Sequence, residues 1–138
     1  NLKTLLTRGF KRESGFSNTG VTVAVSDGTS NTYAEHVLLN ATSHVLQGGV
    51  AAATQWSMSP AAYVPGQSAN ASWSMATNDI KGAYNGVAQT QDTSATVPTV
   101  TQLNVGHVAG SFQLNGYPGK IYGWTRNLSQ SELNAVTA

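Results

Sequence analysis

The sequence predicts an all-β protein with two packed layers of strands and one short helix near the end of the chain. Of its 138 residues, 40% are hydrophobic and 9% are charged, well below the charged fraction of about 25% in average globular domains. Runs of β-branched and aromatic residues alternate with turn dipeptides, a pattern typical of strands joined by tight connections. A chain of this length can bury one core between two layers. We therefore expect a single domain over residues 1–138.

The chain opens on a basic segment. Residues 1–20 hold four of the seven basic residues, namely Lys3, Arg8, Lys11 and Arg12. One interpretation is an edge strand whose charges protect it from pairing with other chains. The other is an arm that docks on an acidic neighbour, which makes Arg8, Lys11 and Arg12 candidate partner-binding residues.

Turn signals divide the middle of the chain into short strands. Asp27-Gly28 ends the first of them, and Asn85-Gly86 predicts a two-residue hairpin turn of type I′ because both residues tolerate positive φ. Pro98 keeps the segment around it out of the centre of a sheet. The predicted strands cover residues 21–25, 33–39, 44–47, 54–58, 71–76, 79–84, 87–90 and 100–106.

The last part of the chain predicts an aromatic strand over residues 120–126 and a helix over residues 129–136. Ser129 and Glu132 have the spacing of a capping box, in which each side chain satisfies an amide at the helix start. Leu128 and Leu133 have the spacing of a hydrophobic staple. Such a short helix is unstable alone, so we expect it to dock on the strands and cover an open end or edge.

Residues 92–138 contain an ordered set of short motifs, preceded by Asn85-Gly86. The motifs are Asp92-Thr93-Ser94, Pro98-Thr99-Val100, Val105-Gly106, Leu114-Asn115-Gly116, Trp124, Leu128-Ser129 and Glu132-Leu133. In this order and spacing the segment resembles the C-terminal half of concanavalin A-like (laminin G-like) jelly-roll domains, of the type found at the C-termini of bacteriophage tail and virion proteins. The resemblance implies a two-sheet antiparallel jelly-roll sandwich. Pro118-Gly119 departs from the family pattern, so we expect that strand to begin near Lys120.

The resemblance also implies a setting. It places the chain on the surface of a phage particle, in contact with other virion proteins and assembled as a homo-oligomer, with a trimer expected. Three functions follow from it: a tail-fibre or surface module that binds a host-surface glycan, a purely structural capsid-decoration or head-fibre domain, or a glycan-cleaving enzyme. Fold alone does not choose among them.

Composition excludes several other classes of function. The net charge of +1 and the lack of a basic stripe with stacking aromatics argue against nucleic acid as a partner. No apolar run is long enough to insert into a membrane, and no cysteine is present for disulfide or thiolate chemistry. The six acidic residues are isolated, so we expect no catalytic carboxylate pair, no metal site and no cofactor. Glu35 and His36 are adjacent, which points them to opposite faces of a strand.

The sequence contains aromatic and polar residues of the kinds that bind carbohydrates. Sugars stack on aromatic rings and hydrogen-bond to polar side chains, and this mixture serves other recognition surfaces. Tyr122, Trp124 and Arg126 alternate and therefore share one face of the last strand. Trp73 and Tyr84 supply further rings, although a tryptophan in a sandwich strand is more often part of the core. These five residues are the candidate carbohydrate-binding set.

Overall fold

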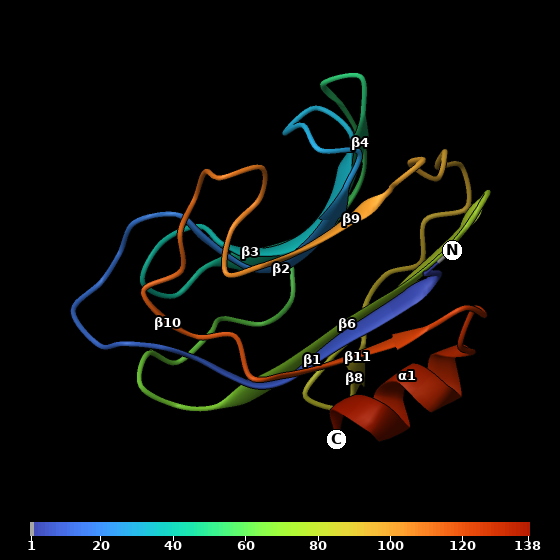
Figure 1. Cartoon of the computed structure of the whole chain (residues 1–138). Coiled ribbons are helices and arrows are strands. Elements are labelled where there is room, and N and C mark those ends of the chain that lie inside the picture. The colour runs from blue at the N-terminus through green and yellow to red at the C-terminus, as the bar shows by residue number, and fades with distance from the viewer. Residues whose placement is uncertain (1) are drawn as a thin grey trace.

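The computed structural model describes residues 2–138 and shows two antiparallel sheets stacked face to face (Figure 1). The six-stranded sheet has the order β10-β1-β6-β7-β8, with β11 also paired to β1, and the five-stranded sheet has the order β5-β4-β3-β2-β9. The strands are β1 (Thr4–Arg12), β2 (Gly20–Ser26), β3 (Tyr33–Leu38), β4 (His44–Val50), β5 (Ala53–Met58), β6 (Ala69–Ala76), β7 (Asp79–Tyr84), β8 (Val87–Ala88), β9 (Gln102–Val105), β10 (Gly116–Tyr117) and β11 (Lys120–Trp124). The predicted all-β jelly-roll sandwich is confirmed.

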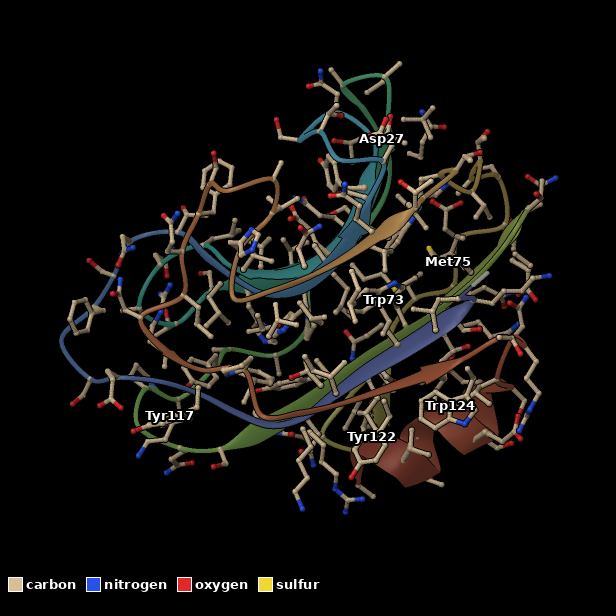
Figure 2. All side chains as sticks on the ribbon, in the orientation of Figure 1. Asp27, Trp73, Met75, Tyr117, Tyr122 and Trp124 are labelled. Atoms are coloured by element: carbon tan, nitrogen blue, oxygen red, sulfur yellow. The ribbon has the colours of Figure 1, made fainter. Side chains whose placement is uncertain are left out.

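The main core lies between the two sheets. Alternate residues of facing strands point inward, as the period of a strand requires, and Trp73 and Met75 lie in the space between the layers (Figure 2). Trp56 reaches the same core from β5, where its indole packs on Gly48 of the neighbouring strand. A second apolar cluster lies on the other face of the five-stranded sheet and includes Val37 and Val108. That face is therefore covered in part, and β2 is buried along its whole length.

The basic N-terminal segment does not form an edge. β1 pairs with β6 on one side and with β10 and β11 on the other, so it is an interior strand of the six-stranded sheet. The expectation of an arm or edge strand over residues 1–20 is therefore wrong for Thr4–Arg12. Leu5 and Phe10 explain the difference, because both are fully buried and anchor the strand in the core despite its charges.

Two local predictions about turns are confirmed. Asn85 and Gly86 have φ of 46° and 80°, both positive as a type I′ turn requires, and they join the paired residues Tyr84 and Val87. The strand that follows Pro118-Gly119 begins at Lys120. Gly119 has a φ of +79°, and a Cβ there would lie 2.4 Å from the Arg8 carbonyl oxygen, so the backbone turns in a place that only glycine fits.

The helix α1 (Gln130–Thr137) is the one helix among residues 2–138, and its start has the predicted capping box. The Glu132 amide donates to Ser129 Oγ at 3.3 Å, and the Ser129 amide donates to Glu132 Oε2 at 2.7 Å. Leu128 and Leu133 are buried in one cluster, which confirms the staple. α1 lies on the outer face of the six-stranded sheet (Figure 1), where it contacts β6 and β7, so it covers a face instead of the expected end or edge.

We expect Ser129→Ala to lower the free energy of unfolding by about 1 kcal/mol, because the change removes the side chain that caps the helix. Urea denaturation measures the loss. Ser17→Ala, at an exposed position outside the helix, is the control and should change stability by less than about 0.5 kcal/mol. Equal effects of the two changes would show that the capping box does not stabilise α1.

Candidate functional site

The aromatic stripe predicted on the last strand lies on the outside of the six-stranded sheet, beside α1 (Figure 2). The rings of Tyr122 and Trp124 are stacked, with centroids 6.4 Å apart and planes inclined by 27°. Tyr122 is 43% exposed. Trp124 packs against the buried pair Leu128 and Leu133, so part of its ring supports the helix. Tyr122 is therefore the residue of the stripe that offers a broad ring surface to solvent.

Arg126 is engaged with the helix start. Its guanidinium makes two hydrogen bonds to Glu132, at 2.7 Å to Oε1 and 3.2 Å to Oε2. This contact, with the hydrogen bonds from Ser129, lowers the pKa of the Glu132 carboxyl to about 2. The three residues of the predicted binding stripe therefore have different environments. The Tyr122 ring is exposed, the Trp124 ring packs against residues of the helix cluster, and Arg126 is paired with Glu132 of the helix cap.

The other two candidate rings lie in different places. Trp73 is 0% exposed, between the sheets (Figure 2), so its assignment as a carbohydrate contact is wrong. Its position at the centre of β6, facing the five-stranded sheet, makes it a core residue. Tyr84 is also mostly buried, but one side of its ring lines a pocket at the end of the sandwich.

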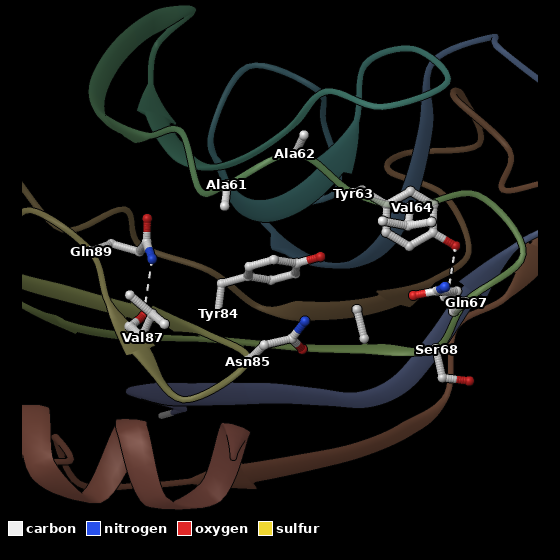
Figure 3. Close-up of a pocket in the computed structure, with 11 residues that line it drawn as sticks. Ala61, Ala62, Tyr63, Val64, Gln67, Ser68, Tyr84, Asn85, Val87 and Gln89 are labelled. Atoms are coloured by element: carbon white, nitrogen blue, oxygen red, sulfur yellow. Dashed lines mark hydrogen bonds between the residues drawn. The ribbon is translucent and has the colours of Figure 1, made fainter.

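This end pocket has a volume of about 310 Å³ (Figure 3). Tyr84 lies across its middle, and Val64 and Val87 form exposed walls. Two of its polar side chains donate to carbonyl oxygens of the pocket's own turns. Tyr63 donates to the Gln67 carbonyl oxygen at 3.0 Å, and Gln89 donates to the Val87 carbonyl oxygen at 3.0 Å. The end pocket therefore has a mainly apolar lining, and none of its lining residues is charged.

The three basic residues predicted to bind a partner differ in their exposure to solvent. Arg8 is exposed and Lys11 is half-buried. Arg12 is 0% exposed, and its guanidinium donates to the carbonyl oxygens of Asn18, Asn40 and Leu38. Its assignment as a partner contact is wrong, because the folded chain itself surrounds the charge.

A different pocket lies on the face of the five-stranded sheet that points away from the main core. We call it the outer-face pocket. Its volume is about 260 Å³. Strands β3 and β4 form its floor, and the loop of residues 106–114 crosses over that floor (Figure 1). The lining residues are Thr19, Ser30, Tyr33, Glu35, Val37, Leu39, Gln47, Val108 and Phe112.

Glu35 is the central polar residue of the outer-face pocket. It is 6% exposed, and its Oε1 accepts a hydrogen bond from Gln47 Nε2 at 2.8 Å. Its Oε2 is buried and has no hydrogen-bond partner among residues 2–138. Burial raises the pKa of the Glu35 carboxyl above its ordinary value, while the Gln47 hydrogen bond acts in the opposite direction. A buried oxygen without a donor costs free energy, so this atom has an unused capacity to accept a hydrogen bond.

The loop of residues 106–114 holds a ring at the rim of the outer-face pocket. Val108 anchors the loop, because it is buried in the outer apolar cluster. The Val21 amide donates to the Phe112 carbonyl oxygen at 2.9 Å and fixes the far side of the loop. Phe112 has a φ of 56° and is 50% exposed. A large residue in the left-handed region is strained, and such strain concentrates at functional sites.

Tyr33 supplies a second ring. It lies opposite Gly49 in the β3–β4 ladder, and a Cβ built on Gly49 would lie 2.9 Å from Tyr33 Cε1. The Tyr33 ring therefore rests on backbone that has no side chain. Burial raises the pKa of the Tyr33 hydroxyl, and the nearby Glu35 charge raises it further.

The outer-face pocket combines two rings, one buried carboxyl, an amide and hydroxyls. This combination suits a ligand with an apolar face and several hydroxyl groups. Adjacent positions in a strand predict opposite faces for Glu35 and His36, and this is confirmed, since Glu35 lines the pocket while His36 is buried near Phe10. The alternation of Tyr33 and Glu35 was a signal that could have identified the site. Phe112 carried no signal, because its place depends on the path of a loop.

Two other features bear on what the chain could bind. No cluster of three or more histidine, cysteine, aspartate or glutamate side chains that could hold a metal ion occurs within residues 2–138. In the same range, no helix has the length and apolar character needed to cross a membrane.

No protein-family model matches the chain, and no curated protein matches it in sequence. Solved structures do match. The chain is similar to the CBM40 domain of Ruminococcus gnavus IT-sialidase bound to α2,3-sialyllactose, with a TM-score of 0.78, 16% identity, and coverage of 99% of this chain and 84% of that one. The same domain bound to α2,6-sialyllactose gives a TM-score of 0.71 at 16% identity, with coverage of 99% and 84%. The chain has a jelly-roll fold. At this level of identity the likeness concerns fold.

The leech intramolecular trans-sialidase complexed with 2,7-anhydro-Neu5Ac is also similar, with a TM-score of 0.73 and 13% identity. The match covers 99% of this chain and 23% of that protein. In this enzyme, the jelly-roll fold is one part of a larger chain.

Proposed function

We propose that this domain is a non-enzymatic carbohydrate-binding module and that the outer-face pocket is its binding site. The observation that carries the proposal is the buried Glu35 Oε2, which lacks a donor in a pocket bordered by the rings of Tyr33 and Phe112. A sugar supplies what this site lacks, because its hydroxyls donate hydrogen bonds and its C–H faces stack on rings. The fold shared with CBM40 domains that hold sialyllactose supports the same class of function.

The contents of the pocket favour binding over catalysis. Glycoside hydrolysis requires two carboxyl groups on either side of the scissile bond, about 5–10 Å apart. Among the lining residues, all of them within 2–138, Glu35 is the single acid. A lone carboxyl can orient a hydroxyl, but it cannot serve as both acid and nucleophile in one turnover.

We expect Tyr33→Ala and Gly49→Ala each to weaken glycan binding about tenfold or more. The first change removes a stacking ring, worth about 0.5–1.5 kcal/mol beyond its buried area. The second removes no pocket side chain, but its methyl group would lie 2.9 Å from Tyr33 Cε1, so the ring must tilt away. A glycan array followed by calorimetric titration of the hits measures both effects.

The matched control is Tyr122→Ala, which removes the most exposed ring of the stripe on the other sheet. It should leave glycan affinity unchanged. Loss of binding in Tyr122→Ala with retention in Tyr33→Ala would move the site to the stripe beside α1. An array with no reproducible hit for the wild-type chain would contradict the proposal and favour a purely structural module.

We further propose the setting that the sequence resemblance implies. The domain belongs to a bacteriophage tail fibre or other surface appendage, works as a homotrimer beside other virion proteins, and presents the pocket to glycans on the host surface. Its support is the ordered motifs of residues 92–138. Of the three basic residues predicted to bind a partner, exposed Arg8 and half-buried Lys11 remain available for such a contact.

A further inference from the structure

The basic residues of the chain come from the strands of one sheet or from residues close to them in sequence. The sequence has no lysine or arginine between residues 13 and 80, the range that contains β2, β3, β4 and β5, and none in β9. All seven basic residues belong to the strands of the six-stranded sheet or to residues next to them: Lys3, Arg8, Lys11, Arg12, Lys81, Lys120 and Arg126. The strands of the five-stranded sheet therefore contribute no lysine or arginine. The guanidinium of Arg12, from β1, reaches the carbonyl oxygens of Leu38 and Asn40, but Arg12 is 0% exposed and does not line the outer-face pocket.

One acidic residue lies on this face, and another belongs to an adjoining loop. Glu35 lies in the outer-face pocket itself. Asp27 belongs to the β2–β3 loop, whose Ser30 also lines the pocket. A ligand carboxylate placed beside Glu35 would meet a like charge and an acceptor oxygen where it needs donors. An uncharged sugar would instead meet an acceptor that its hydroxyl or acetamido N–H can satisfy.

We propose that the outer-face pocket selects uncharged saccharides and rejects those that carry a carboxylate, sulfate or phosphate. The inference rests on the proposed function. It separates this chain from the similar CBM40 structures, which hold sialyllactose, a sugar with a carboxylate. Glu35 Oε2 accepts a hydrogen bond from the bound sugar, Gln47 holds the other carboxyl oxygen, and Tyr33 and Phe112 contact the apolar face of the ring.

The test uses pairs of oligosaccharides that share one neutral core, with and without an acidic residue, such as lactose against α2,3-sialyllactose. Calorimetric titration at low salt should give at least tenfold tighter binding for the neutral member of a pair, which is about 1.4 kcal/mol. Raising the salt concentration should narrow this ratio, because screening weakens the repulsion.

Glu35→Gln tests the source of the discrimination, since it keeps the shape of the side chain and removes the charge. We expect the ratio of the affinities for the neutral and the acidic member of a pair to fall toward one. Asp92→Asn is the matched control, because Asp92 pairs with Ile80 of the six-stranded sheet, and it should keep the wild-type ratio. The salt series on the wild-type chain gives a second measurement that does not depend on the folding of the variant.

The outcomes separate this inference from the proposed function. Acidic sugars that bind as tightly as their neutral cores would overturn the charge selectivity and leave carbohydrate binding in place. Amino sugars with a free ammonium that bind tighter than neutral sugars would also overturn it, in favour of a cationic ligand. Absence of binding to any glycan would overturn the proposed function, and the selectivity with it.

Discussion

Replacing Arg12 with methionine is expected to lower the free energy of unfolding by about 1.5–3 kcal/mol, the size of a contribution from hydrogen bonds made by a charged group. Arg12 is fully buried at the end of β1. Its guanidinium joins three stretches of chain, since it donates to the carbonyl oxygens of Asn18 and Asn40 and, at 3.3 Å, to that of Leu38. Methionine has no donors, so the buried Leu38 carbonyl and the partly buried carbonyls of Asn18 and Asn40 would lose their partner.

The charge of Arg12 is compensated in an unusual way. No ion pair to Arg12 occurs within the described residues 2–138, and its contacts are carbonyl dipoles instead. Arginine can fill such a site because its planar fork points several donors in fixed directions. Arg12→Lys should therefore also be destabilising, although the charge is kept, because an ammonium cannot reach three carbonyls in the same geometry.

Urea denaturation of Arg12→Met and Arg8→Met measures the difference between a buried and an exposed arginine on one strand. Arg8→Met, at an exposed position, should change stability by less than about 0.5 kcal/mol. If Arg12→Met is equally mild, Arg12 does not hold the three segments together.

The sequence predicted most strands because the turns that bound them depend on local chemistry. Asp27-Gly28 and Asn85-Gly86 favour turns wherever they occur, and Ser129 with Glu132 caps a helix by contacts within four residues. The position of β1 could not be predicted in this way. Its Arg8, Lys11 and Arg12 resemble an exposed edge, and the carbonyls that surround Arg12 come from segments far along the chain.

The candidate site was predicted less well, and for a physical reason. Strand alternation tells which residues share a face, but it does not tell which face is covered. Trp73 points to the main core and Tyr33 to a surface pocket. Both faces of β2 are buried because Val108 brings a loop onto the outer face. The outer-face pocket exists only where that loop meets β3 and β4, a contact that no local pattern encodes.

The second large effect that we expect is a loss of stability as the pH falls below about 6.5, caused by two histidines buried next to each other. His44 Nε2 lies 2.8 Å from the Ala61 carbonyl oxygen, which can only accept, so His44 carries its proton there. His44 Nδ1 then accepts from His36 Nε2 at 2.9 Å, and His36 Nδ1 accepts from Thr22 Oγ1 at 2.8 Å. All four ring nitrogens have partners with both rings neutral.

Protonation of this pair is unfavourable in the folded state. His36 is fully buried, and its ring centroid lies 4.6 Å from that of Phe10. Burial lowers the pKa of His36 well below the ordinary value, and charge repulsion from His44 lowers it further. Burial also lowers the pKa of His44, against an opposing effect of the Ala61 hydrogen bond. In the unfolded chain both imidazoles titrate near the ordinary histidine pKa of 6.5. Below that pH the unfolded chain binds more protons than the folded chain does, so stability falls as pH falls.

The size of the effect follows from proton linkage. Each histidine that stays neutral in the folded state lowers the free energy of unfolding by up to about 1.4 kcal/mol for each pH unit below its unfolded pKa. At pH 5 the loss is about 2 kcal/mol per histidine relative to neutral pH. Glu35 acts in the opposite direction, because its pKa is raised by burial and the folded state takes up a proton first. Glu132, with a pKa of about 2, loses its stabilising contacts only at much lower pH.

Urea denaturation between pH 7.5 and pH 5 in a Glu35→Gln background therefore isolates the histidine pair. We expect a steep decline of stability in that background, and a decline of about half the slope when His36→Gln is added, because one titrating group is removed. His107→Gln, in the loop over the outer face, is the control and should keep the full slope, since His107 is outside the buried pair. A stability that stays level down to pH 5 would show that the folded protein admits a proton to the pair. The hydrogen-bonded chain from Thr22 to Ala61 would then rearrange instead of excluding the charge.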